Sequence, residues 1–204
     1  MAHRLLYLVR PGAHDSDPGD PLDGGSLTEL GRQQVSLLAD RLDGVDLTTV
    51  HHSSALRAVQ TADVLAFRLP EVPRHSDDLL RECIPTVPAE ESLTPRQREF
   101  FAQLPARARQ EGPARAAEVI ARYTTVGDTD SAELVITHGN LINQFVAHAM
   151  GAPDTGWLRL TDYHCGLTVI RCADDGPPRI LGYNDVGHLP PELRGLDYPP
   201  ELRV

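Results

Sequence analysis

Short apolar runs alternate with segments of helical periodicity over most of this chain. Residues 4–9 and 133–138 are apolar runs that are each followed closely by a glycine, which is typical of buried strands. Residues 27–42 and 141–150 repeat their apolar positions every three or four residues, which predicts amphipathic helices. Strands and helices in alternation predict a mainly parallel sheet with helices on both faces. We therefore expect an α/β fold, a three-layer sandwich.

A chain of 204 residues suits a single domain. We expect this domain to span residues 1–189, with a small helical insert at about 83–127. Two helices are predicted within the insert, at roughly 96–110 and 113–126, separated by Gly112-Pro113.

The carboxy-terminal part is predicted to contain short strands and a tail. The strands are expected near residues 158–162, 166–172 and 179–183. Residues 190–204 contain Pro-Pro-Glu-Leu-Arg twice, and such proline spacing favours an extended, proline-rich tail.

Charge and hydropathy argue against two classes of partner. The formal net charge of -10 argues against a nucleic-acid-binding protein, which needs a cationic surface. No segment approaches the roughly 20 apolar residues of a membrane span, and the first residues do not resemble a secretory signal. We therefore expect no membrane association and a cytoplasmic location, and the oligomeric state stays open.

The cationic and sulfur-containing residues limit the chemistry further. All 19 cationic residues are arginines, whose forked guanidinium groups suit phosphate and carboxylate. Cys83, Cys165 and Cys172 lack the spacing of metal ligands and are odd in number, so neither a metal site nor a disulfide framework is expected. No cofactor is expected either.

Polar residues follow three of the predicted strands. They lie at residues 10–12, 51–53 and 137–139. Because the carboxyl ends of parallel strands meet at one edge of a sheet, these three segments could converge on one site.

Four segments together resemble the histidine phosphatase superfamily, which includes the phosphoglycerate mutases. They read LVRPG at 8–12, LTELGRQQ at 27–34, SSALRAVQTA at 53–62 and VITHG at 135–139. Their order and spacing match that family over nearly the whole chain, and LRE at 80–82 and YNDVGHL at 183–189 are similar to further family segments. The resemblance implies the phosphoglycerate mutase-like form of the α/β sandwich.

The resemblance also implies roles for particular side chains. Arg10, Arg57 and His138 would surround a phosphate, and Glu82 would give a proton to the leaving oxygen. Phosphoryl transfer depends mainly on positioning and positive charge, so arginines can serve without a metal. The further residues that we expect to contact the substrate are Gly12, Thr137, Asn140 and His14.

Residue 11 departs from the family pattern, in which the strand end reads Arg-His-Gly. There the histidine attacks phosphorus and becomes a phosphohistidine. Pro11 cannot accept a phosphoryl group, and it also lacks a backbone N–H that could point at a bound anion. We expect phosphohistidine chemistry to be impaired or absent. A replacement nucleophile, for which His14 is one possibility, stays open.

Three functions from different classes are compatible with these residues. The first is a phosphatase lineage that acts on small phosphomonoesters. The second is a pseudophosphatase that binds a phosphorylated or carboxylate ligand without turning it over. The third is an acid-base enzyme, a lyase or isomerase, that uses Glu82 and His138 on an anionic substrate.

Overall fold

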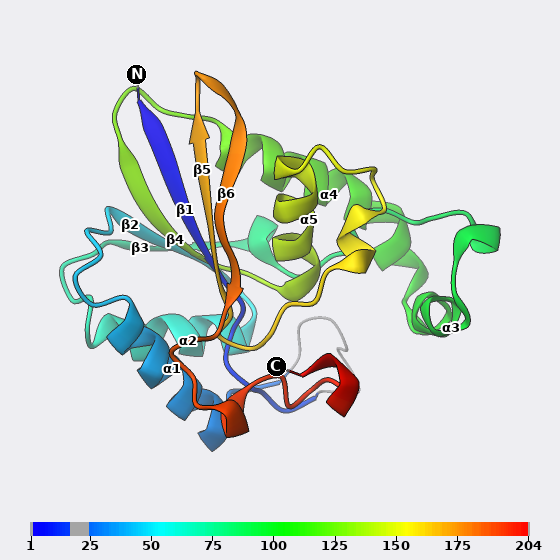
Figure 1. Cartoon of the computed structure of the whole chain (residues 1–204), viewed down its shortest axis with the longest axis horizontal. Helices are drawn as coiled ribbons and strands as arrows, with labels where there is room; N and C mark the ends of the chain where they lie inside the picture. Colours follow the sequence, from blue (N-terminus) through cyan, green and yellow to red (C-terminus); the bar gives the residue numbers. More distant parts are fainter. Residues whose placement is uncertain (1, 17–24, 204) are drawn as a thin grey trace.

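A computed structural model describes residues 2–16 and 25–203 of the chain (Figure 1). Within these residues, six strands form one sheet in the order β3-β2-β4-β1-β5-β6. The strands are β1 His3–Val9, β2 Thr49–Ser53, β3 Arg74–Asp77, β4 Ser131–Ile136, β5 Leu167–Ala173 and β6 Gly176–Asp185. Residues 1, 17–24 and 204, which the expected domain and tail include, lie outside the described residues.

The sheet is mainly parallel. β3, β2, β4 and β1 run in the same direction, and β5 is antiparallel to both of its neighbours. The carboxyl ends of the four parallel strands therefore lie at one edge of the sheet, at the bottom of Figure 1. The predicted fold class is confirmed by this architecture.

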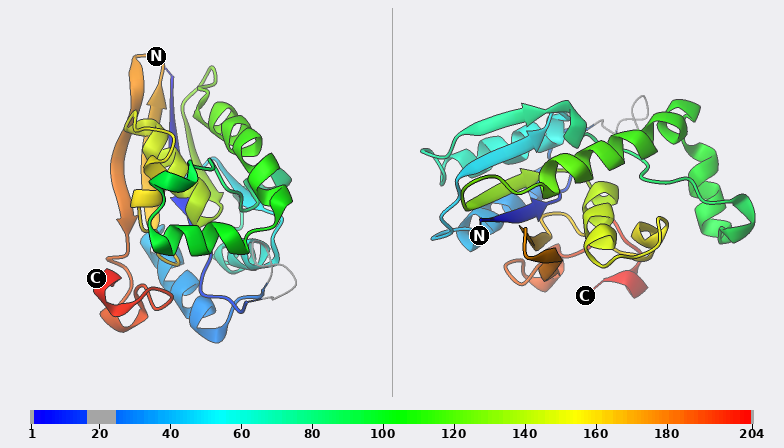
Figure 2. Two further views of the ribbon diagram at one scale, coloured as in Figure 1. Left: turned by 90° about the vertical axis from the view of Figure 1, so that its right-hand side faces the viewer. Right: turned by 90° about the horizontal axis from the view of Figure 1, so that it is seen from above.

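Helices cover both faces of the sheet, and the described residues contain five α-helices in all. They are α1 Glu29–Arg41, α2 Leu56–Ala66, α3 Pro95–Gln103, α4 Ala106–Thr124 and α5 Gly139–Ala149, and five short 3-10 turns are named η1 Asp78–Leu80, η2 Glu90–Ser92, η3 Gly156–Arg159, η4 Pro191–Leu193 and η5 Pro200–Leu202. α1 and α2 lie on one face, and α4 and α5 lie on the other (Figure 2).

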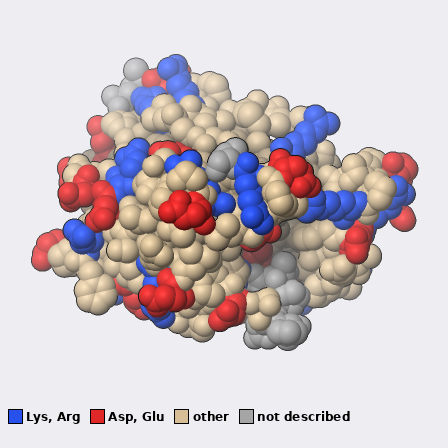
Figure 3. Space-filling model, turned by 60° about the horizontal axis from the view of Figure 1, so that its bottom comes forward, with Lys and Arg blue, Asp and Glu red and all other residues tan. Residues whose placement is uncertain are grey.

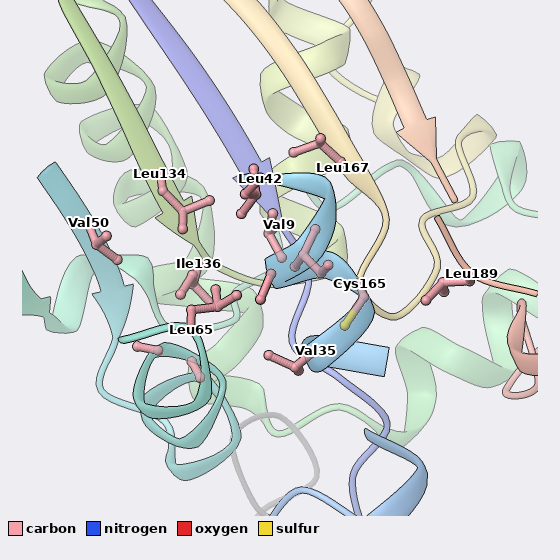
Figure 4. Packing of buried hydrophobic residues seen from close by; sticks show 14 of the residues in the cluster. Val9, Val35, Leu42, Val50, Leu65, Leu134, Ile136, Cys165, Leu167 and Leu189 are labelled. Carbon is pink, nitrogen blue, oxygen red and sulfur yellow. The ribbon is translucent and has the colours of Figure 1, made fainter. Parts of the chain in front are cut away.

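Alternation along β1 explains how one strand serves both cores. Leu6 and Leu8 point into the core under α4 and α5, whereas Tyr7 and Val9 pack into the core with α1 and α2. Successive side chains of a strand point to opposite faces, so a strand between two helix layers must be apolar at nearly every position. Figure 4 shows Val9 among Val35, Leu134 and other members of the α1 and α2 core. Each buried aliphatic side chain contributes about 1.5–3 kcal/mol.

The loop after β1 lies tightly against the start of α1. A Cβ atom on Gly31 would come within 2.0 Å of the Ala13 carbonyl oxygen, and one on Gly12 within 2.5 Å of the Gly31 carbonyl oxygen. Thr28 caps α1 by accepting a hydrogen bond from the Gly31 N–H at 3.1 Å. These contacts hold residues 10–13 in place at the edge of the sheet.

The helices of the insert break at a different residue from the one predicted. α3 ends at Gln103, its C-cap Leu104 is extended because Pro105 follows it, and α4 then begins at Ala106. α4 continues through Gly112 and Pro113, where we predicted the break. A Cβ on Gly112 would lie 2.4 Å from the Ile84 carbonyl oxygen, so this helix packs directly on the backbone near Glu82.

The prediction of a strand near residues 158–162 is wrong. Residues 156–159 form the 3-10 turn η3, which buries Trp157 against Phe101. The Trp157 indole N–H donates to Thr86 Oγ1 at 2.9 Å. Apolar residues in a short segment cannot distinguish a strand from such a turn.

Residues 190–203 fold back onto the body of the protein and are not extended. They form η4 and η5, and Leu193 is buried in the core with α1 and α2. The Gln34 side-chain amide donates to the Leu193 carbonyl at 2.8 Å. This packing brings the segment 195–198 to the carboxyl ends of the strands.

Among the described residues, every helix is too short or too polar to span a bilayer.

Candidate functional site

A pocket of about 220 Å³ lies at the carboxyl ends of the parallel strands. The described residues that line it are Arg10, Pro11, His14, Arg57, Glu82, Phe100, His138, Gly139 and Asn140. Arg10 follows β1, Glu82 follows β3, and His138 follows β4, so the fold brings together residues far apart in the sequence. Of the eight side chains and loop residues predicted for the site, six line the pocket: Arg10, His14, Arg57, Glu82, His138 and Asn140.

A chain of hydrogen bonds joins Arg57, His138 and Ser53. Arg57 Nη2 lies 2.9 Å from His138 Nδ1, and His138 Nε2 lies 2.9 Å from Ser53 Oγ. A guanidinium can only donate, so Nδ1 is the acceptor and Nε2 carries the proton that it donates to Ser53. Burial, together with the charges of Arg57 and Arg10, holds the pKa of His138 well below its usual range. His138 is therefore neutral and holds Arg57 in place.

Arg10 is anchored by the carboxy-terminal part of the chain. Its Nη1 donates to the Asp162 carbonyl at 2.5 Å, and its Nη2 donates to Asp197 Oδ2 at 2.8 Å. Tyr198 lies beside the guanidinium, with its ring centroid 6.0 Å away, and its hydroxyl donates to the same carbonyl of Asp162. A guanidinium has five N–H groups, so these contacts orient Arg10 and use only part of its donor capacity.

Glu82 is partly buried, and its carboxyl lies at the amino end of α5. Its Oε1 accepts from the Cys83 N–H at 3.0 Å, and its Oε2 accepts from the Asn140 N–H at 3.3 Å. Burial raises the pKa of Glu82 to about 7, although these N–H groups and the charge of Arg57 act in the opposite direction. A carboxyl with such a pKa can hold a proton at neutral pH and give it up, as an acid catalyst must.

The backbone of the loop after β1 does not point its N–H groups into the pocket. Pro11 has none, Gly12 donates to Thr61 Oγ1 at 3.4 Å, and Ala13 donates to Gln34 Oε1 at 2.9 Å. Gly12, which we expected to contact the substrate, is buried against Gly31 and does not line the pocket. The close packing of its backbone against Gly31 explains why residue 12 is a glycine.

Thr137 also lies away from the pocket. It is fully buried, and its hydroxyl donates to the Leu80 carbonyl at 2.8 Å. Asn140, in contrast, lines the pocket, and its side-chain amide donates to the Cys83 carbonyl at 3.2 Å. Thr137 and Asn140 therefore both fix the backbone around Glu82, which lies between residues 80 and 83.

Sequence patterns missed three residues at or beside the pocket. Phe100 of α3 lines it and is 39% exposed. Asp162 and Asp197 reach it through Arg10, and the carboxyl of Asp162 is buried without a hydrogen-bond partner among the described residues. None of the three belongs to a motif, because their positions depend on how the insert and the last residues pack.

The described residues contain no group of three or more His, Cys, Asp or Glu side chains that could hold a metal ion. On the face seen in Figure 3, arginines lie interspersed with aspartates and glutamates. The positive charge of the pocket is thus local, in a chain whose net charge is -10.

Comparisons with known proteins agree with this geometry. A family model for the histidine phosphatase superfamily (branch 1) matches residues 6–186. Serine/threonine-protein phosphatase Pgam5 of Caenorhabditis briggsae is 33% identical over 195 residues, which are 93% of this chain and 66% of that protein. The human PGAM5 is 32% identical over 193 residues, which are 94% of this chain and 65% of that protein. The chain thus spans about 66% of the length of these curated relatives.

Solved structures show the same fold. YhfR of Bacillus stearothermophilus matches at a TM-score of 0.69 and 25% identity, over 91% of this chain and 98% of that one. A phosphoglycerate mutase of Plasmodium falciparum matches at a TM-score of 0.60 and 25% identity, over 93% of this chain and 96% of that one. A mutant phosphoserine phosphatase of Entamoeba histolytica, in complex with phosphoserine, matches at a TM-score of 0.66 and 18% identity, over 91% of this chain and 99% of that one.

The expectation of a cytoplasmic location is contradicted by these relatives, which are named as mitochondrial proteins. That expectation relied on the first residues of a chain that is shorter than its relatives. The amino-terminal residues of such a chain are no guide to location.

Proposed function

This chain belongs to the histidine phosphatase superfamily (branch 1), and on that basis we propose that its pocket binds the phosphoryl group of a phosphomonoester. The observation that carries the proposal is the convergence of Arg10, Arg57 and the partly buried acid Glu82 on one pocket of about 220 Å³. This volume suits a phosphoryl group with a few atoms of the attached alcohol, either of a small molecule or of a phosphorylated side chain.

Positive charge is supplied by the two arginines. Arg57 is held by His138, and Arg10 is held by the Asp162 carbonyl and by Asp197, so both guanidinium groups are oriented before a ligand arrives. Preorganised cations stabilise the charge on the equatorial phosphoryl oxygens without a cost of reorganisation.

Glu82 is proposed as the acid that protonates the leaving oxygen. Its raised pKa keeps a large fraction of the carboxyl protonated near neutral pH. The two backbone N–H groups that it accepts from stabilise the carboxylate left after proton transfer.

The nucleophile is the incomplete part of this site. Proline at residue 11 offers no atom that can attack phosphorus, which favours ligand binding without rapid turnover as a second candidate function. The third function, acid-base catalysis by Glu82 and His138, is less favoured. Both ring nitrogens of His138 are engaged, by Arg57 and by Ser53.

Phosphate binding tests the proposal directly. Inorganic phosphate should raise the Tm of the parent protein, because a ligand that binds the native state stabilises it. Arg57→Gln removes a charge-assisted donor and should weaken phosphate binding by about tenfold or more. Arg107→Gln is the matched control, because Arg107 is 82% exposed on α4 and pairs with Glu111 outside the pocket. An unchanged Tm in the parent protein, or equal binding by both variants, would contradict the proposal.

A further inference from the structure

Two imidazole rings line the pocket, and they differ in what their nitrogens can do. Those of His138 are both engaged, as described above. His14 lies on the loop after β1, three residues beyond Pro11, and makes one hydrogen bond among the described residues, from Nδ1 to the Gly12 carbonyl at 3.3 Å. A carbonyl oxygen only accepts, so Nδ1 carries the proton and Nε2 keeps its lone pair.

The surroundings of His14 favour this neutral form. Burial, together with the positive charges of Arg57 and Arg10, lowers its pKa to about 4, so the ring is unprotonated near neutral pH. An imidazole with a free lone pair, beside two arginines that can hold a phosphoryl group, meets the electronic requirement for a nucleophile.

The ring is also held in place. Its centroid lies 5.1 Å from the ring centroid of His164, at an interplanar angle of 39°. His164 is buried, and its Nε2 lies 3.5 Å from Oδ2 of Asp197, the carboxylate that binds Arg10. His14 and Arg10 are thus positioned by the same carboxy-terminal segment.

We propose that Nε2 of His14 accepts the phosphoryl group in this protein, in place of a side chain at residue 11. The inference rests on the proposed phosphomonoester binding. In the first step, a bond forms between Nε2 and phosphorus while the bond from phosphorus to the ester oxygen breaks. Glu82 gives its proton to that oxygen, so an alcohol leaves and Glu82 becomes a carboxylate.

A second step restores the protein. Glu82 takes a proton from a water molecule as the water oxygen attacks phosphorus, and the bond between phosphorus and Nε2 breaks. Inorganic phosphate is released, His14 recovers its lone pair, and Glu82 is protonated again. During both steps the Nδ1–H group stays hydrogen-bonded to the Gly12 carbonyl, which stabilises the positive charge that develops on the ring.

Other histidines near the strand ends do not meet these conditions. His52 is buried, with Nδ1 at 3.0 Å from the Ser53 carbonyl, and it does not line the pocket. His164 is buried behind His14 and does not line the pocket either.

The experiment is a search for the phosphoenzyme. The parent protein, His14→Asn, His148→Asn and Glu82→Gln are each incubated with p-nitrophenyl phosphate, and acid-labile phosphohistidine is measured by intact mass and peptide mapping. His14→Asn keeps an amide donor for the Gly12 carbonyl but has no nucleophilic nitrogen. His148 is exposed on α5, away from the pocket, and provides the matched control.

We expect phosphoenzyme in the parent protein and in His148→Asn, and a loss of at least about 100-fold in His14→Asn. Glu82→Gln should accumulate phosphoenzyme, because its second step lacks the base. The phosphate-induced rise in Tm, measured on every variant, shows that each is folded and binds.

Two results would overturn the inference and leave the proposed function standing. One is phosphate binding by the parent protein without any phosphoenzyme, and the other is an undiminished phosphoenzyme in a folded His14→Asn. A parent protein that binds no phosphate would instead overturn both.

Discussion

Nη2 of Arg10 donates a hydrogen bond to Oδ2 of Asp197 at 2.8 Å, across 187 positions of the sequence. The two side chains are 17% and 30% exposed, so solvent screens the pair only in part. The carboxylate of Asp197 therefore takes up one N–H donor of the guanidinium that we expect to bind phosphate. It holds Arg10 in position, and it also competes with an incoming anion for the positive charge.

Asp197→Asn should tighten phosphate binding. The amide can still accept a hydrogen bond from Arg10, but it no longer neutralises the guanidinium charge. An ion pair of this exposure is worth up to about 1 kcal/mol, which corresponds to an affinity for phosphate about two- to fivefold higher. Calorimetric titration with phosphate measures this change. Asp175→Asn is the control, because it alters an exposed ion pair with Arg171 away from the pocket. Weaker phosphate binding by Asp197→Asn would show that the orientation of Arg10 by Asp197 matters more than the competition between Asp197 and phosphate.

Pro11→His should increase the hydrolysis of p-nitrophenyl phosphate. Residue 11 lines the pocket between Arg10 and His14, and a histidine there would add a nucleophile of the kind that the family resemblance implies. A gain over the parent is expected, because the added imidazole would supply a second nucleophile beside the two arginines.

Two further variants separate the possible reasons for such a gain. Pro70→His places a histidine on an exposed surface and should change nothing. The double variant Pro11→His with His14→Asn should keep the gained activity, because residue 11 would then carry the phosphoryl group. A silent but folded Pro11→His that binds phosphate would mean that the site has diverged beyond this one residue.

Glu82 should control both the pH dependence and the leaving-group dependence of hydrolysis. The acid form is the active one in the first step, and burial raises its pKa to about 7, so the rate with an alkyl phosphate should fall as the pH rises through about 7. Glu82→Gln should remove this pH dependence. It should also lower the rate of hydrolysis of an alkyl phosphate much more than the rate of phosphoenzyme formation from p-nitrophenyl phosphate, because the nitrophenolate leaving group needs little protonation. Equal losses with both substrates would argue against the role of Glu82 as an acid.

The sequence predicted the fold and the centre of the site because both depend on local patterns. Apolar runs and helical periodicity identify β1, β4, α1 and α5, and the polar residues that follow parallel strands must meet at one edge of the sheet. Arg10 and His138 follow predicted strands and were expected at this edge, whereas Arg57 and Glu82 were expected only from the family resemblance. All four line one pocket.

The errors share a different physical origin. Gly12 and Thr137 are close to the site in sequence, but Gly12 packs on Gly31 and Thr137 donates to Leu80, so the patterns around them report on packing. Asp162 and Asp197 belong to no motif, and they reach Arg10 only because of tertiary packing. Long-range packing of this kind leaves no periodic signal in the sequence.

Asp162 should make the stability of the protein fall as the pH rises from about 4 to about 8. Its carboxyl is fully buried without a hydrogen-bond partner among the described residues, and burial raises its pKa to about 8. A group that binds its proton more tightly in the folded state stabilises the protein below the pKa of the unfolded chain, about 4, and loses this contribution as the pH rises through about 8. Between pH 5 and pH 9 the parent should therefore lose more free energy of unfolding than Asp162→Asn does, by at least about 2 kcal/mol.

Urea unfolding at the two pH values measures this difference. Asp175→Asn is again the control, because that carboxyl lies on the surface. A parallel pH dependence in the parent and in Asp162→Asn would show that the buried carboxyl is not the group responsible.

Phe100 should select for the alcohol part of the substrate and not for its phosphoryl group. Its ring, on α3 of the insert, lines the same pocket as Arg57 and Glu82, and it is 39% exposed and thus open to a ligand. Burying an aromatic or aliphatic substituent against such a ring is worth about 1 kcal/mol or more. Phe100→Ala should therefore weaken the binding of phenyl phosphate by about fivefold or more and leave the binding of inorganic phosphate nearly unchanged. Phe67→Ala is the control, because Phe67 follows α2 and is 86% exposed. An equal loss of affinity of Phe100→Ala for phenyl phosphate and for inorganic phosphate would mean that Phe100 shapes the anion site itself.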